Sequence, residues 1–209
     1  MGDNLCIFNF KNMTEARIKK LENVLNKRQV TLGVVLENVH DPHNISAVMR
    51  TCDAVGIQDM FILNTYIPPY KKWGFKSSSS ASKWMSIHSF EDREKCMAVL
   101  KNKYENILAA CLIPGAASLY DLDLSKSMAL VFGNEKDGVS EEMKALVNGF
   151  FKIPQVGIIE SLNISVACAV TLYEAFRQRD AQKMYDFPQM QNSQKKLLRE
   201  NWGLPFQAQ

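Results

Sequence analysis

Short apolar runs alternate with segments of helical periodicity along most of the chain. The apolar runs at residues 31–36, 60–63, 106–112, 128–132 and 150–153 are short enough for strands. The segments 45–55, 90–103, 140–147 and 162–179 repeat apolar residues at helical spacing. Strands that are apolar throughout need cover on both faces, as in parallel sheets whose strands are connected by helices. The pattern therefore predicts an α/β fold with a mostly parallel sheet flanked by helices on both faces.

The composition is typical of one globular domain. Of the 209 residues, 46% are hydrophobic and 22% charged, which is enough for one sizeable core. The longest apolar runs are far too short to cross a bilayer, and the N-terminus lacks a cationic segment followed by an apolar one. Five scattered cysteines without a CxxC pair and only three histidines offer few ligands for a metal. We expect a cytoplasmic protein with no metal and no membrane segment.

Helical extensions are expected on both sides of the sheet. Residues 14–28 combine a helical apolar stripe with a basic face, and such a helix either binds a polyanion or lies solvated on the core. The tail 187–209 predicts a short helix with an aromatic anchor, packed on its own domain or on a second subunit. We therefore divide the chain into a basic N-terminal helical extension (1–29), a sheet domain (30–180) and a C-terminal helical extension (181–209).

The segment 66–86 interrupts the alternation and predicts a long loop. It contains prolines, lysines, a run of four serines and Trp84. Long loops in compact domains are usually functional or mobile, and these residue types suit contacts with phosphates and bases. A surface insertion without such a role is the alternative.

Three polar segments, residues 37–50, 132–138 and 153–165, stand where predicted strands end and helices begin. Ligand sites of parallel α/β sheets lie at this edge. Taken singly, the residues have ordinary explanations: helix caps for Asn44 and Ser161, a turn for Gly133, a solvated carboxylate for Glu135. Arg50 is harder to explain, because it interrupts an apolar stretch and would need an anionic partner if it were buried.

The combination of these residues is more informative than any one of them. The stretches are HDPHNISAVMRTCDAVG with Asn44 and Arg50, FGNEKDGVSEE with Gly133, Glu135 and Gly138, and ESLNISVACAVTLYEAFRQR with Ser161, Leu162, Asn163 and Ser165. The set resembles the SPOUT superfamily and, within it, the TrmH family of tRNA (guanosine-2'-O)-methyltransferases. The resemblance extends from about Thr14 to Arg179.

The resemblance implies features of fold and cofactor that periodicity does not predict. In that family the C-terminal half is threaded into a deep trefoil knot, the protein is a homodimer, and the knotted loops bind S-adenosyl-L-methionine. By resemblance the cofactor pocket is lined by Ala110, Gly133, Ile153 and Leu162. No GxGxxG motif follows the first predicted strand, which disfavours an ordinary dinucleotide site and a dinucleotide-dependent oxidoreductase.

The resemblance also implies roles for polar and basic residues. Those implied for catalysis are Arg50, Asn44, Glu135, Ser161 and Asn163. Those implied for RNA binding are Arg17, Lys20, Arg28, Lys83 and Arg177. Because a guanidinium holds its proton firmly, our hypothesis is that Arg50 clamps a phosphate and stabilises the developing alkoxide, while phosphate or water accepts the proton. Arg50 acting as the base itself is the alternative.

The implied activity is 2'-O-methylation of a ribose in tRNA, with guanosine 18 of the D-loop as the expected target. Methylation of ribosomal RNA is the first alternative, although such relatives often carry a further N-terminal domain, for which about thirty residues are present here. A non-catalytic RNA-binding protein of the same fold is the second alternative, and the intact Arg50, Glu135, Ser161 and Asn163 argue against it.

Overall fold

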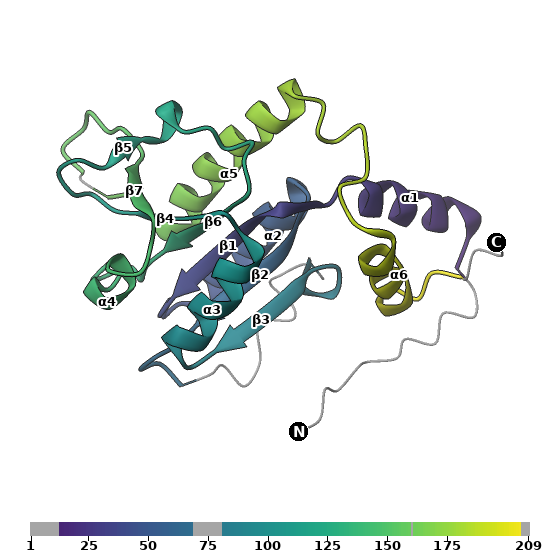
Figure 1. Cartoon of the computed structure of the whole chain (residues 1–209), viewed down its shortest axis with the longest axis horizontal. Coiled ribbons are helices and arrows are strands. Elements are labelled where there is room, and N and C mark those ends of the chain that lie inside the picture. Colours follow the sequence, from purple (N-terminus) through teal and green to yellow (C-terminus); the bar gives the residue numbers. More distant parts are fainter. Residues whose placement is uncertain (1–12, 69–80, 160, 206–209) are drawn as a thin grey trace.

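One sheet of seven strands, all paired in parallel, is present in the described residues of the computed structural model, which are 13–68, 81–159 and 161–205. The strands are β1 (Gln29–Glu37), β2 (Ile57–Leu63), β3 (Ser86–Phe90), β4 (Asn106–Ala110), β5 (Ala117–Ser118), β6 (Met128–Phe132) and β7 (Gly149–Lys152). Across the sheet they follow the order β3-β2-β1-β6-β4-β7-β5 (Figure 1). The predicted parallel sheet is confirmed.

Helices cover both faces of this sheet, as predicted. The α-helices of the described residues are α1 (Glu15–Asn26), α2 (Pro42–Ala54), α3 (Arg93–Lys103), α4 (Glu141–Lys144), α5 (Ile164–Ala181) and α6 (Asn192–Asn201). Helices α2 and α5 pack on one face, and α3 and α4 on the other. Side chains of β1 alternate between the two layers, with Val34 and Leu36 facing α2 and α5, and Val35 facing α3. A strand buried on both faces has to be apolar throughout, which explains the sequence pattern.

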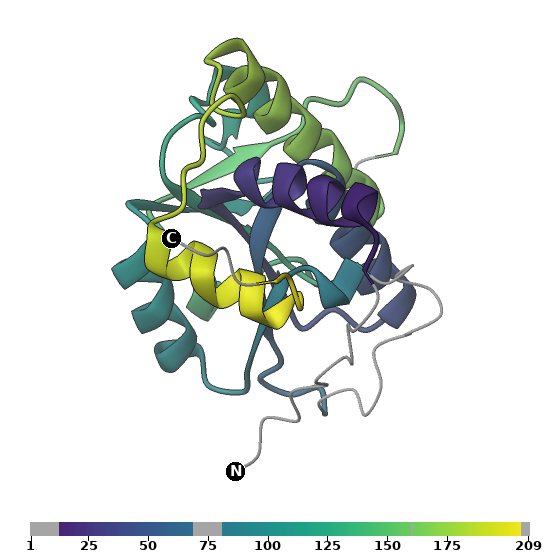
Figure 2. The ribbon, with the colours of Figure 1, turned by 90° about the vertical axis from the view of Figure 1, so that its right-hand side faces the viewer.

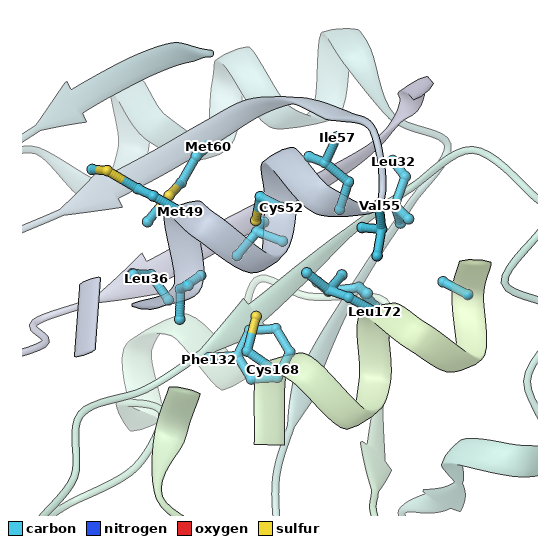
Figure 3. Packing of buried hydrophobic residues seen from close by; sticks show 14 of the residues in the cluster. Leu32, Leu36, Met49, Cys52, Val55, Ile57, Met60, Phe132, Cys168 and Leu172 are labelled. Carbon is cyan, nitrogen blue, oxygen red and sulfur yellow. The ribbon is translucent and has the colours of Figure 1, made fainter. Parts of the chain in front are cut away.

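The contact between α2 and α5 joins the N-terminal and C-terminal halves of the sheet domain. Cys52 of α2 and Cys168 of α5 approach one another in this layer, between Met49, Val55 and Leu172 (Figure 3). All five side chains are buried. The packing places the first turn of α5 near the first turn of α2, at the carboxyl edge of the sheet.

The terminal helices α1 and α6 pack side by side, away from the β4–β7 part of the sheet (Figures 1 and 2). Leu25 of α1 and Leu198 of α6 share a cluster with Trp202, which is almost fully buried and forms a T-shaped ring pair with Trp84. An ion pair between Glu22 and Arg199 also joins the two helices. The tail therefore packs on its own chain through the predicted aromatic anchor Trp202, whereas Phe206 lies outside the described residues.

A cluster of polar side chains around the buried Asp59 joins β2, β3 and α3. The Asp59 carboxylate lies 2.8 Å from His88 Nε2 and 2.6 Å from Lys103 Nζ. Burial by itself raises the pKa of Asp59, but the hydrogen bonds and charges of His88 and Lys103 outweigh it, so the pKa falls below its ordinary value. The ionised carboxylate therefore stabilises the packing of three elements.

Two strands were missed, and one helix was placed too early. Residues 86–90 form β3, whereas the helical prediction began at Phe90; α3 starts at Arg93, and the Asp92 side chain caps it. Three of the five residues of β3 are serine or histidine, and Ile87 and Phe90 pack on opposite faces of the sheet, so this edge strand has no apolar run and resembles a polar loop. The two-residue strand β5 is too short to leave a pattern. Most of the long predicted loop, residues 69–80, lies outside the described residues.

Candidate active site

The carboxyl ends of β4, β6 and β7 surround a cavity of about 370 Å³. The rest of its lining comes from the turns after these strands, from Lys144 of α4 and from the start of α5. All four residues assigned to a cofactor pocket line this cavity, namely Ala110, Gly133, Ile153 and Leu162. Its size suits a small organic ligand.

The lining of the cavity has apolar and charged parts. The apolar part includes Phe132, Phe151 and Ile164, and the charged part includes Glu135, Asp137 and Lys144. A 2.7 Å hydrogen bond to Glu141 raises the pKa of Lys144 above its ordinary value, so this side chain is cationic at neutral pH. Such a cavity can hold a ligand that has an aromatic end and an end with charges of both signs.

The loop 133–138 folds back on itself through its own backbone. Asn134 and Gly138 form an isolated bridge with two 3.1 Å hydrogen bonds. A Cβ atom on Gly133 would lie 1.9 Å from the carbonyl carbon of Gly138, so only glycine allows this approach. Gly138 itself has φ of +70°, a conformation that glycine adopts without strain. The two glycines are therefore needed to form this wall of the cavity.

A buried carboxylate holds the end of the same loop. Glu37, at the end of β1, accepts hydrogen bonds from the Ser140 amide at 2.9 Å and the Ser140 hydroxyl at 2.6 Å. Arg93 of α3 donates to the same carboxylate at 3.5 Å. Glu37 is only 1% exposed, and Ser140 caps α4. The position of the loop is thus fixed by an ionic contact beneath it.

Three side chains from distant turns form one hydrogen-bonded chain at the carboxyl edge. The Asn44 side-chain amide donates to Glu135 Oε1 at 2.7 Å, and the Asn163 amide donates to Asn44 Oδ1 at 3.2 Å. The backbone N–H of His40 donates to the other Glu135 oxygen at 3.4 Å. The three polar segments singled out in the sequence therefore meet at one place.

The first turn of α5 completes this arrangement. Asn163 caps the helix, because its Oδ1 accepts from the Ser165 amide at 2.8 Å and from the Ser165 hydroxyl at 2.6 Å. Ser161 precedes the cap and lines the cavity. One residue, Asn163, thus starts a helix with its oxygen and contacts Asn44 with its nitrogen.

Arg50 lies on the outer face of α2 and does not line the cavity. Its buried neighbours Val48, Met49 and Cys52 face the sheet and α5, so the helix turns Arg50 toward solvent. Exposure removes the need for the internal anionic partner that burial would have required. Its guanidinium forms no ion pair within the described residues, so it can bind an incoming anion.

Four of the five cations assigned to RNA binding are exposed. Arg17 and Lys20 lie on α1, and Lys83 lies in a 3-10 turn at the edge of the sheet. Arg177 of α5 is also exposed, but Glu174 on the same helix accepts two hydrogen bonds from it, at 2.7 and 2.9 Å. The structure does not bring these cations into the cavity described above.

The assignment of Arg28 to RNA binding does not fit its position. Its side chain is completely buried, with Nη2 2.6 Å from Asp53 and the guanidinium over the Trp202 ring. It also donates to the backbone carbonyls of Ile57 and Trp84. Burial lowers the pKa of Arg28, and Asp53 opposes this shift. The sequence showed a cation at the end of a basic helix, but the helix ends at Asn26, and Arg28 points into the core.

Within residues 13–68, 81–159 and 161–205, no group of three histidine, cysteine, aspartate or glutamate side chains is arranged to hold a metal. In the same residues no helix has the length and apolar character needed to span a bilayer.

Sequence reasoning missed the residues that hold the site from beneath. Glu37, Arg93 and Ser140 had been noted only as parts of a segment or as the start of a helix. A glutamate directly after the apolar run 31–36 was the available signal, because a carboxylate buried at the end of a strand needs donors around it. Asn134, whose amide oxygen accepts from two backbone amides of its own loop, gave no such signal.

A parallel sheet with a partly charged cavity at the carboxyl ends of its strands defines an α/β enzyme that binds a small ligand at that edge. Residues 31–173 match the SpoU rRNA Methylase family, and the chain belongs to this family.

Named relatives match nearly the whole chain. The tRNA (guanosine(18)-2'-O)-methyltransferase of Thermus thermophilus is 41% identical over 182 residues, which are 86% of this chain and 92% of that protein. The Aquifex aeolicus enzyme of the same name is 34% identical over 195 residues, covering 90% and 89%. The crystal structure of the A. aeolicus TrmH/SpoU tRNA modifying enzyme matches with a TM-score of 0.82 at 34% identity, covering 90% of this chain and 96% of that one.

Proposed function

We propose that this protein is an S-adenosyl-L-methionine-dependent methyltransferase that modifies the ribose 2'-hydroxyl of guanosine 18 in tRNA. The observation that carries the proposal is the hydrogen-bonded chain beside the cavity, in which Asn163 donates to Asn44 and Asn44 donates to Glu135. The named relatives in Thermus and Aquifex, which match almost the full chain, support this substrate.

The cavity fits the chemical groups of the cofactor. Ala110, Ile153 and Leu162 would contact the adenine, and Lys144 with the acidic loop residues would face the carboxylate and ammonium of the methionine part. When bound, S-adenosyl-L-methionine supplies a methyl group on a positively charged sulfur. The hydrogen bonds from Ser140 to Glu37 and the two glycines of the loop would keep this pocket open before binding.

The residues around the cavity would act mainly by orientation. Methyl transfer from a sulfonium to an oxygen neutralises charge, so alignment of the reacting atoms matters more than stabilising new charge. The side chains that would hold the ribose and the loop in their reacting positions are Asn44, Glu135, Ser161 and Asn163. Arg50, exposed and unpaired within the described chain, would bind the adjacent phosphate and stabilise the developing alkoxide.

The finer features implied by the family belong to the same proposal. We place the trefoil knot in the segment from β4 to α5, and the homodimer contact on the exposed side of α5, where Val166 and Tyr173 are two helical turns apart. Exposed apolar patches of this kind commonly mark protein interfaces. We also propose that Arg17, Lys20, Lys83 and Arg177 bind RNA phosphates, that the enzyme acts in the cytoplasm, and that residues 1–29 and 181–209 are extensions of the methyltransferase domain.

The decisive experiment incubates unmodified tRNA and, separately, ribosomal RNA with labelled S-adenosyl-L-methionine, followed by mapping of the methylated nucleotide. We expect label on guanosine 18 of tRNA. Label on ribosomal RNA alone would favour the other substrate, and cofactor binding without any methylation would indicate a non-catalytic RNA-binding protein.

Asn163→Asp tests the hydrogen-bonded chain itself. Aspartate keeps the oxygen that caps α5 but cannot donate to Asn44, so we expect an unchanged melting temperature with turnover reduced about a hundredfold. Full activity in this variant would show that the asparagine contact has no part in the reaction.

A further inference from the structure

Two aromatic side chains stand next to each other beside the Glu135 network. Tyr66 follows β2, His40 follows β1, and their ring centroids are 6.0 Å apart with an interplanar angle of 48°. Tyr66 is 59% exposed, and His40 is exposed as well. Since so much of the Tyr66 ring is in solvent, burial in the core does not explain its position.

The Tyr66 side chain is nevertheless held at its far end. Its hydroxyl oxygen accepts a 2.8 Å hydrogen bond from the side-chain nitrogen Nδ2 of Asn134, and Asn134 is buried in the loop that lines the cavity. Asn134 cannot rotate freely, because its oxygen accepts from the backbone amides of Lys136 and Asp137. An exposed ring tethered in this way loses little entropy when a ligand stacks on it.

Two hydrogen bonds between Asn38 and Thr65, called here the Asn38 clamp, hold together the turns that carry the two rings. Asn38 is buried with φ of +50°, and its side-chain oxygen accepts from the Thr65 amide at 2.8 Å while its nitrogen donates to the Thr65 hydroxyl at 3.0 Å. Asparagine tolerates this left-handed conformation better than most residues. The clamp connects the residue before Tyr66 to the turn that continues to His40, so the pair is built into the fold.

The pair is connected directly to the proposed catalytic groups. The backbone N–H of His40 donates to the Glu135 carboxylate that also accepts from Asn44, and Asn134 precedes Glu135 in the chain. A ligand on the two rings would therefore lie beside the place where the ribose is expected. Desolvation and the negative charge of Asp137 raise the pKa of Tyr66, so its hydroxyl is protonated at neutral pH.

We propose that Tyr66 and His40 form a stacking platform for the base of the nucleotide whose ribose is methylated. The inference rests on the proposed function. A base is attached to the carbon next to the one that bears the 2'-hydroxyl, so fixing the base also fixes the reacting oxygen. Unstacked RNA bases bind aromatic side chains through their π-faces, and this contact is tolerant of sequence. The platform thus positions the nucleotide, and other groups select guanosine.

The first test compares Tyr66→Ala, Tyr66→Phe and a matched control, Tyr120→Ala. Tyr120 is 58% exposed but lies after β5 at the opposite edge of the sheet. We expect Tyr66→Ala to lower kcat/KM for tRNA by about 5- to 150-fold, which corresponds to one stacked base. Tyr66→Phe keeps the ring and should stay within about threefold of the wild type, as should Tyr120→Ala.

Affinity for S-adenosyl-L-methionine and melting temperature separate stacking from a structural role. Both should be unchanged in Tyr66→Ala if the ring contacts RNA. A weaker cofactor affinity in that variant would mean that the ring braces the Asn134 loop, and equal losses in Tyr66→Phe and Tyr66→Ala would mean that the hydroxyl is what matters. Either result would overturn the proposal.

The second test uses tRNA that carries an abasic ribonucleotide at the methylated position. If the platform stacks on that base, its removal should weaken wild-type binding, and Tyr66→Ala should bind abasic tRNA within about twofold of the wild type. A persisting tenfold difference between the two proteins on abasic tRNA would refute the assignment. Failure of the proposed function is distinguishable, because the wild-type protein would then leave intact tRNA unmethylated.

Discussion

Replacing Glu37 by alanine should destabilise the protein by about 3–4 kcal/mol. The change removes the acceptor of two hydrogen bonds from Ser140, at 2.9 and 2.6 Å. It also leaves Arg93, which is only 16% exposed, without its buried partner. Breaking a buried ion pair typically costs about 3–5 kcal/mol, and the lower half of this range applies because Arg93 keeps some access to water.

Urea unfolding at neutral pH, followed by circular dichroism, measures this change as a shift in midpoint at constant m-value. Glu142→Gln is the matched control, because Glu142 lies 3.8 Å from the same Arg93 but is 69% exposed. An exposed ion pair contributes at most about 1 kcal/mol, so the control should unfold close to the wild type. Glu37→Ala should also weaken binding of S-adenosyl-L-methionine, because Ser140 ends the loop that lines the cavity.

Similar unfolding midpoints for Glu37→Ala and Glu142→Gln would refute this reasoning. They would mean that the Glu37 carboxylate is as well solvated as Glu142 and does not anchor Ser140. A large loss of stability with unchanged cofactor affinity would refute only the second step, from the anchored serine to the shape of the loop.

Three further predictions concern other parts of the molecule. Gly133→Ala should abolish cofactor binding in calorimetry while the protein remains folded, because the added Cβ would collide with backbone across the loop; tight binding would contradict the described loop. Arg28→Met should lower the melting temperature but leave the Kd of the folded protein for tRNA unchanged. Lys20→Ala should raise that Kd without changing the melting temperature. The reverse pattern would show that Arg28 does contact RNA. The pKa of Asp59 is depressed in the folded state, so the stability that its ionised form contributes is fully present above the ordinary pKa of 3.8 and is lost as pH falls through the lower folded value. Asp59→Asn should therefore weaken the dependence of unfolding free energy on pH in the acid range. An unchanged dependence would exclude this role.

Most of the fold was accessible from the sequence because the sheet is buried on both faces. Continuous apolar runs predicted β1, β2, β4, β6 and β7 to within a few residues, and amphipathic spacing predicted α1, α2 and α5. β3 was missed because this edge strand is only partly covered, and its two serines and one histidine leave no apolar run. The helix after it was then extended back to Phe90, which is the last residue of that strand.

The candidate site was predictable in its residue types but not in its contacts. Asn44, Glu135 and Asn163 lie in segments that the sequence marks as polar turns after strands, and the carboxyl ends of parallel strands share one edge. The hydrogen bonds among them depend on which strands are neighbours, since β6 pairs with β1 and β4 rather than with the strands that precede and follow it in the chain. Periodicity carries no information about that order.

The sequence by itself determined the parallel α/β architecture, the basic first helix and the three polar turns, because these follow from local spacing and residue type. Only the tertiary structure decided which charged side chains are buried. Arg28 and Lys20 belong to the same basic segment, yet one is enclosed by Asp53 and Trp202 while the other is in solvent. The physical reason is that the cost of burying a charge is offset by partners distant in sequence, and local sequence does not encode them.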